Sequence, residues 1–114
     1  MKLTMERTHG KVVLHLEEER LDAHNAGGLK DHVLEVLESG DLHLIIDLGR
    51  VRFVDSSGLG ALLSGHKNAA LRRGTLALAN LQPQVQSMFE LTRLHRVFKI
   101  HDNLAEALNV RGPS

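Results

Sequence analysis

The sequence has no cysteine, no tryptophan and no tyrosine, and only three phenylalanines among 114 residues. Without cysteine, the chain cannot form a disulfide framework, a cysteine-ligated zinc site or a thiol nucleophile. Proteins that bind single-stranded nucleic acid stack the bases on aromatic rings, and this chain has few such rings to offer. It also lacks any run of about 18 apolar residues, so we expect no insertion into a membrane.

Neither sign of charge is in excess, because 14 Lys and Arg residues balance 14 Asp and Glu residues. A nucleic-acid binder needs a basic surplus to neutralise phosphates, so we expect no direct nucleic-acid partner. The length is typical of one domain, and 42% of the residues are apolar, which is enough to build a core. We therefore expect a soluble, cytosolic, single-domain α/β or α+β protein.

The apolar pattern predicts strands alternating with helices. The first two strands form a hairpin around His9 and Gly10, and the alternation after residue 40 favours a largely parallel sheet with that hairpin at its edge. The predicted strands cover residues 1–8, 11–16, 42–48, 75–80 and 97–100. The predicted helices begin near residues 26, 59, 83 and 104, and the second buries Leu59, Leu62, Leu63, Ala69 and Ala70. Asp102 or Asn103 caps the last helix.

The most informative segment is Asp-Leu-Gly-Arg-Val-Arg-Phe-Val-Asp-Ser-Ser-Gly-Leu-Gly at 47–60. A buried strand leads there into a polar turn at the start of a helix, where free backbone N–H groups can tolerate an anion. Three enzyme motifs that combine glycine with a helix start are absent. Leu63 stands where a dinucleotide fingerprint needs glycine, no Gly-Lys-Ser/Thr of a P-loop is present, and neither serine has the glycine that a nucleophile elbow requires two residues earlier. We expect no catalytic residue and no cofactor.

Two interpretations of the serine pair remain open. In one, Ser56 or Asp55 caps the helix, which is worth about 1 kcal/mol. In the other, one serine is phosphorylated, which adds about −1.5 to −2 charges that the helix dipole favours and Asp55 repels. The eight histidines include no pair at the i, i+4 spacing of helical metal sites, so we expect no metal and predict ordinary surface and loop residues.

The segment Phe53–Gly60, after the Leu-Ile-Ile-Asp-Leu strand, resembles the phosphorylation-site segment of bacterial STAS-domain anti-sigma factor antagonists. Three further stretches resemble that family in the same order, namely Arg20–Asp22, Leu91–Ile100 and Ala105–Leu108. The resemblance implies an α/β fold with a single STAS domain over residues 1–110. It implies a mixed β-sheet with an N-terminal β-hairpin edge, about four α-helices, and a flexible tail at 111–114.

The resemblance also implies a function. In that family the unphosphorylated antagonist binds an anti-sigma factor that is itself a serine kinase, and so releases a sigma factor. The phosphoacceptor of the family falls on Ser57, the partner-binding surface on Asp22, Asp55, Ser56, Ser57 and Gly58, and a PP2C-type phosphatase removes the phosphate. Such a protein is a kinase substrate that regulates transcription, and not an enzyme. The alternative is a structural STAS partner of a membrane transporter or signalling complex, without a phospho-switch.

Overall fold

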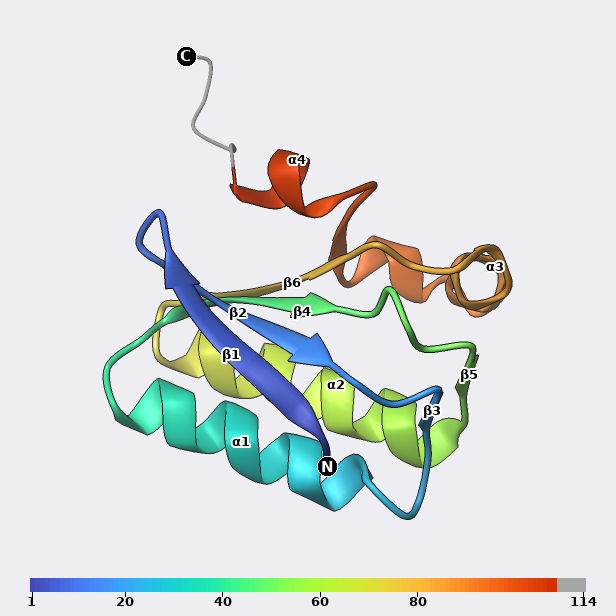
Figure 1. The fold of residues 1–114 in the computed structure, drawn as a ribbon, viewed down its shortest axis with the longest axis horizontal. Coiled ribbons are helices and arrows are strands. Elements are labelled where there is room, and N and C mark those ends of the chain that lie inside the picture. The colour runs from blue at the N-terminus through green and yellow to red at the C-terminus, as the bar shows by residue number, and fades with distance from the viewer. Residues whose placement is uncertain (109–114) are drawn as a thin grey trace.

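A five-stranded mixed sheet forms the centre of the protein, seen in the computed structural model of Figure 1. The structure describes residues 1–108, so the predicted domain end at 110 and the tail at 111–114 lie outside the described residues. The strand order is β1-β2-β4-β6-β7, with bounds Leu3–Thr8, Lys11–Leu16, His43–Asp47, Thr75–Ala79 and Lys99–His101. Only β1 runs antiparallel to its neighbour, which confirms the predicted hairpin edge on a parallel sheet.

The hairpin between β1 and β2 closes through a two-residue turn. His9 and Gly10 have φ values of 54° and 74°, and the flanking pair is Thr8 with Lys11. Two consecutive positive φ values are typical of the type I′ turn, whose twist matches that of the strands it joins. This geometry sets the register that places β1 at the sheet edge.

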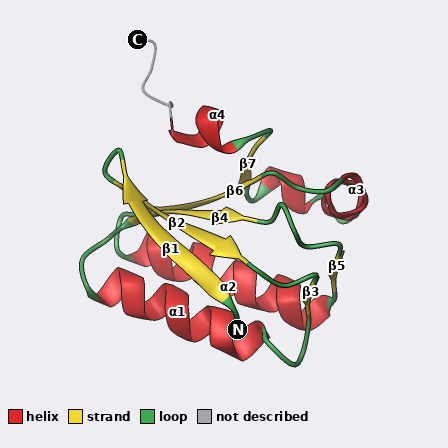
Figure 2. Cartoon of the chain, viewed as in Figure 1, coloured by secondary structure: helices red, strands yellow, loops and turns green. Residues whose placement is uncertain are grey.

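Helices cover both faces of the sheet, as Figure 2 shows. The helices α1 (Ala26–Glu38) and α2 (Ser56–Leu71) lie on one face, and the short α4 (Leu104–Leu108) lies on the other. In β4, Leu44 and Ile46 join the main core, while Ile45 joins a smaller core with Val13, Ala79 and Ala107 under α4. The nearly continuous apolar run of β4 is explained by this burial on both faces. Within residues 1–108, no helix has the length and apolarity needed to cross a bilayer.

The buried face of α2 differs from the predicted one. Its buried residues are Gly58, Ala61, Leu62, Gly65 and Ala69. Leu63 and Ala70 are exposed, so the prediction that they face the core was wrong. Small residues determine this face because α2 lies very close to its neighbours: a Cβ on Gly65 would lie 2.8 Å from Leu76 Cδ1.

The C-terminal part differs from the predicted strand at 97–100. Helix α3 (Pro83–Leu91) is followed by the 3-10 helix η1 (Leu94–Arg96), and β7 begins only at Lys99. Phe98 instead enters the core, where its ring packs edge-on against Phe89 with centroids 5.7 Å apart. Of the two predicted caps of α4, Asn103 takes the role, since its Oδ1 accepts a hydrogen bond from the Glu106 N–H at 2.8 Å.

Candidate functional site

The start of α2 presents the two serines to solvent. Asp55 is the N-cap: its Oδ1 accepts a hydrogen bond from the Gly58 N–H at 2.9 Å, and its backbone is extended, with φ −99° and ψ −175°. The cap is therefore Asp55 rather than Ser56. Ser56 and Ser57 occupy the first two helical positions, and both are exposed. Both hydroxyls are thus accessible at the positive end of the helix dipole.

Two short strands that the sequence did not reveal hold this helix start in place. The strand β3 (Arg20–Leu21) runs parallel to β5 (Phe53–Val54), and pairs Leu21 with Val54. The Leu21 carbonyl oxygen also accepts a hydrogen bond from the Asp55 N–H at 3.2 Å. Gly58 is buried against Leu21, and a Cβ there would lie 2.9 Å from Leu21 Cγ. Asp22 directly follows Leu21, and so continues from the residue that contacts Asp55 and Gly58.

The Asp22 loop is closed by its own hydrogen bonds. Asp22 Oδ1 accepts from the His24 N–H at 3.0 Å, and Asn25 Oδ1 accepts from the Asp22 N–H at 2.9 Å. The Asn25 side chain also donates to the Arg20 carbonyl oxygen at 2.7 Å. The bond from the His24 backbone, aided by Arg20, holds the pKa of Asp22 below its ordinary value, so this carboxylate is charged at neutral pH. Sequence reasoning missed Asn25, whose only signal was an asparagine just before the helix at Ala26.

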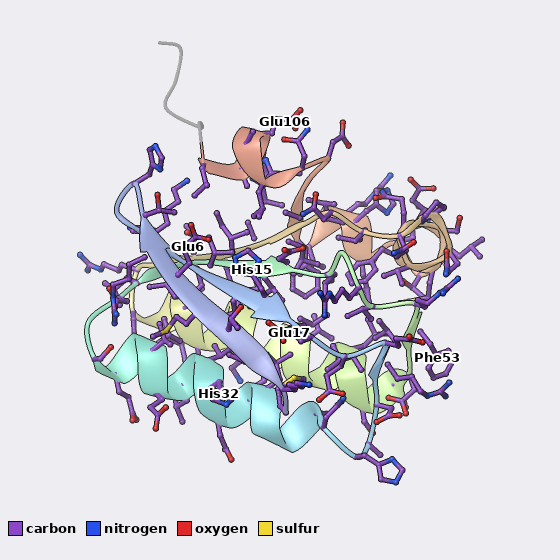
Figure 3. All side chains as sticks on the ribbon, in the orientation of Figure 1. Glu6, His15, Glu17, His32, Phe53 and Glu106 are labelled. Carbon is purple, nitrogen blue, oxygen red and sulfur yellow. The ribbon has the colours of Figure 1, made fainter. Side chains whose placement is uncertain are left out.

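Arg20 and Phe53 form an exposed cation–π pair across the β3–β5 strands. The Arg20 guanidinium sits 4.3 Å from the centroid of the Phe53 ring, a cation–π geometry, and its Nε lies 3.4 Å from Asp22 Oδ2. Phe53 is 44% exposed, and Figure 3 shows it beside β5 at the margin of the molecule, pointing away from the sheet. Neither Arg20 nor Phe53 was among the predicted site residues. The signal for both would have been their opposite positions in two strands too short to recognise.

A polar network at the strand ends fixes the loop that leads into β5. His15 Nδ1 lies 2.7 Å from Asp47 Oδ2, and His15 Nε2 lies 2.9 Å from Glu6 Oε1 (Figure 3). The other oxygen of Asp47 accepts from the Gly49 N–H at 2.9 Å and from the Asn80 side chain at 3.1 Å. The loop after β4 is thereby tied to three strands of the sheet.

Three histidines contradict the prediction of ordinary surface and loop positions. Burial lowers the pKa of His15, but the hydrogen bonds and charges of Glu6 and Asp47 outweigh it and raise that pKa overall. His101 is only 8% exposed, and burial lowers its pKa, with help from the charge of Lys99. The His66 ring packs against Phe98, with centroids 5.4 Å apart. Across residues 1–108, no three His, Asp or Glu side chains are grouped in a way that could hold a metal ion.

A groove of about 440 Å³ lies next to the β3–β5 pair. It is lined by Glu17, Glu18, Glu19, Gly49, Arg50, Arg52 and Gln82. Its walls carry charges of both signs, and Gln82 crosses it to donate to the Gly49 carbonyl oxygen at 2.6 Å. The groove is therefore a polar, charged depression rather than a hydrophobic binding cavity.

Of the predicted site residues, Asp55, Ser56, Ser57 and Gly58 lie together at the start of α2. Asp22 directly follows Leu21, which accepts a hydrogen bond from Asp55 and packs against Gly58. The STAS domain model matches residues 2–107 of the chain. This chain belongs to the STAS-domain family. One STAS relative is the anti-sigma F factor antagonist of Paenibacillus polymyxa, which is 28% identical over 109 residues, or 95% of this chain and 92% of the relative.

Solved structures of STAS proteins share the fold. The anti-sigma factor antagonist SpoIIAA in its unphosphorylated form superposes with a TM-score of 0.74 and 25% identity, over 98% of this chain and all of that one. The Bacillus cell fate determinant SpoIIAA in its phosphorylated form superposes with a TM-score of 0.72 and 23% identity, over 96% of this chain and all of that one. The STAS domain described here is thus related to the anti-sigma factor antagonists.

Proposed function

We propose that this STAS domain is an anti-sigma factor antagonist switched by phosphorylation of Ser57. The unphosphorylated domain would bind an anti-sigma factor that is also a serine kinase, and would thereby release a sigma factor. The kinase would transfer the γ-phosphoryl group of ATP to Ser57 Oγ, with ADP as the leaving group and the hydroxyl proton taken up by the kinase. A PP2C-type phosphatase would hydrolyse the phosphate ester and restore binding.

The observation that carries this proposal is the exposed Ser57 on the first turn of α2, next to Gly58, which packs against β3 just before Asp22. Both serines are exposed, so the choice of Ser57 over Ser56 rests on the family resemblance. Relatives support the functional class: one is named as an anti-sigma F factor antagonist, and SpoIIAA is described in both an unphosphorylated and a phosphorylated form.

Charge provides the physical mechanism of the switch. A phosphate on Ser57 carries about −1.5 to −2 charges at neutral pH, next to the carboxylates of Asp22 and Asp55. The helix N-terminus favours this charge, so the fold would be retained. The surface formed by the exposed Ser56 and Ser57 and the partly buried Asp22 and Asp55, supported by the buried Gly58, would change from weakly to strongly acidic. Like-charge repulsion would then release a partner whose contact surface is acidic or apolar.

The proposed role is that of a binding module and kinase substrate, with no reaction of its own. A protein that controls a sigma factor works in the cytoplasm, and we propose that location.

The test is phosphorylation by the cognate kinase, followed by mass spectrometric mapping. We expect the modification on Ser57 in the parent protein and in Ser56→Ala, which is the matched control at the neighbouring exposed position. Ser57→Ala should remain unmodified, and Ser57→Asp should bind the kinase at least tenfold more weakly than the parent. Undiminished phosphorylation of Ser57→Ala, or full binding by Ser57→Asp, would contradict the proposal. Stable capture of a membrane transporter by both the parent and Ser57→Asp would support the structural-subunit alternative.

A further inference from the structure

The charged groups around Ser57 include a cation that the proposed switch has not used. On the acidic side, Asp55 caps the helix that carries Ser57, and Asp22 follows the strand that pairs with β5. On the basic side, the Arg20 guanidinium bonds Asp22, and His24 Nδ1 lies 3.7 Å from the other Asp22 oxygen. Arg20 is 62% exposed, whereas Asp22 is only 16% exposed. The carboxylate is therefore fixed, while the guanidinium is held at the surface by weak contacts.

Two contacts hold Arg20 in the unmodified chain, and both are weak. Its Nε lies 3.4 Å from Asp22 Oδ2, a long hydrogen bond, and an exposed ion pair of this kind contributes little to stability. Its stacking on the Phe53 ring is weak as well, because cation–π contacts at exposed sites are screened by water. A phosphate dianion offers a guanidinium two parallel, charge-assisted hydrogen bonds, which are stronger than either contact. Arg20 would gain by exchanging Asp22 for a phosphate close by.

The backbone brings Arg20 close enough for this exchange. Arg20 lies in β3 opposite Phe53, and Phe53 is two residues before the cap residue Asp55. Leu21, which follows Arg20, touches Gly58. The loop at Asp22 is rigid because Asn25 bonds both the Arg20 carbonyl oxygen and the Asp22 N–H. Arg20 and Ser57 are thus the chain neighbours of two residues in direct contact, Leu21 and Gly58, and arginine has a long, flexible side chain.

We propose that Arg20 is the internal counter-ion of phosphorylated Ser57, and that its guanidinium leaves Asp22 and the Phe53 ring to bind the phosphate. This inference rests on the proposed function, because it presupposes a phosphate on Ser57. It adds that phosphorylation rearranges the surface as well as charging it. The modified surface loses the cation over Phe53, exposes that ring further, and leaves Asp22 without its arginine.

The experiment uses the full chain with phosphoserine incorporated at position 57 during translation, so that neither kinase nor partner is needed. Phosphorus NMR then gives the second pKa of the phosphate, which is about 6 for a free phosphoserine. We expect a value below 6 in the parent chain. Arg20→Gln should raise this pKa by about half a unit or more. Arg20→Lys should raise it by less, since lysine keeps the positive charge but cannot donate the two parallel hydrogen bonds of a guanidinium. Asp22→Asn should lower it, because it removes a repelling carboxylate and frees Arg20.

Arg52→Gln is the matched control, since Arg52 is also exposed and adjoins Phe53 but lines the groove beside Glu17–Glu19. Equal pKa changes for the Arg20 and Arg52 variants, or a phosphate pKa of 6 or above in the parent, would overturn the inference. Failure of Ser57 as the natural acceptor would leave these NMR values unchanged, so the two proposals fail separately.

The main comparison of a second measurement, between the unmodified and the phosphoserine forms, needs no Arg20 variant. The chain has no tryptophan, so Phe53→Trp creates a single fluorescent reporter beneath the guanidinium. We expect its emission intensity and maximum to change between the unmodified and the phosphoserine forms as Arg20 leaves the ring. Arg20→Lys in the same background should reduce that change. Identical emission from both forms would refute the movement of Arg20.

Discussion

Gly58 packs so closely against the backbone of Leu21 that no side chain fits between them. A Cβ on Gly58 would lie 2.9 Å from Leu21 Cγ and closer still to the Leu21 carbonyl oxygen. That oxygen already accepts the hydrogen bond from the Asp55 N–H, so it cannot move away without disturbing the cap of α2. The contact joins the Asp22 loop to the serine pair.

We therefore expect Gly58→Ala to push the start of α2 away from β3. Overpacking against backbone typically costs about 1–3 kcal/mol in the free energy of unfolding, which urea denaturation would measure. Binding of the proposed partner, an anti-sigma factor kinase, should weaken in the same variant, because the spacing of the Asp22 loop and Ser57 would change. Gly60→Ala is the matched control: Gly60 is exposed on the same helix, with nothing within 4 Å of its Cβ position. Equal free energies of unfolding for the two variants would show that close packing against Leu21 does not destabilise Gly58→Ala.

Asp55 combines a structural and a surface role, and two substitutions separate them. Asp55→Ala removes the acceptor of the Gly58 N–H and should lower the free energy of unfolding by about 1 kcal/mol. Asp55→Asn keeps a good capping oxygen but removes the charge, so we expect stability within about 0.5 kcal/mol of the parent. Any change in partner affinity of Asp55→Asn then measures the charge alone. A loss of stability as large as that of the alanine variant would contradict the capping role.

The two glycines in the first turn of α1 should differ in how their replacement by alanine changes the stability of the protein. Nothing lies within 4 Å of a Cβ on Gly27, so Gly27→Ala should stabilise the helix by about 0.5–1 kcal/mol. A Cβ on Gly28 would lie 2.8 Å from Met1 Cβ, so Gly28→Ala should lose that gain by displacing Met1. Thermal or urea unfolding of the two variants checks this. Equal stabilisation in both would mean that the Met1 contact yields at no cost.

Periodicity predicted the long elements of this fold and missed the short ones that build the site. The hairpin at the sheet edge, the alternation of strands with helices and the four helices follow from apolar spacing and turn residues, which are local signals. The strands β3 and β5 have two residues each, too few for any period, and they exist because Leu21 and Val54 meet across 33 positions of sequence. The predicted buried face of α2 was wrong because apolar periodicity favours leucine and gives glycine no weight. Close helix packing selected Gly58 and Gly65 instead, and no apolar pattern reveals that.

The serines and Asp55 could be predicted because helix capping is local, whereas their grouping with Asp22 depends on tertiary contact. Arg20 and Phe53 were missed for the same reason. Each is an unremarkable exposed residue in the sequence, and only the strand pairing stacks one on the other.

His15 and His101, the two histidines with shifted pKa values, predict stability changes of opposite sign with pH. The pKa of His15 is raised above its ordinary value of 6.5 by Glu6 and Asp47, so protonated His15 stabilises the fold. That stabilisation is complete below pH 6.5 and is lost as the pH rises through the folded pKa. The pKa of His101 is lowered by burial, so its protonation opposes folding, and stability is lost as the pH falls below about 6.5.

Urea unfolding of the parent, His15→Gln and His101→Gln between pH 5 and 8.5 separates these effects. The stability advantage of the parent over His15→Gln should shrink as the pH rises, because the ionic contacts with Glu6 and Asp47 disappear with the proton. Its advantage over His101→Gln should shrink as the pH falls, because the parent must then bury a charge near Lys99. Each variant is the control for the other, since both remove one histidine from the same sheet. A flat difference for His15→Gln would mean that its two carboxylate contacts contribute nothing through charge.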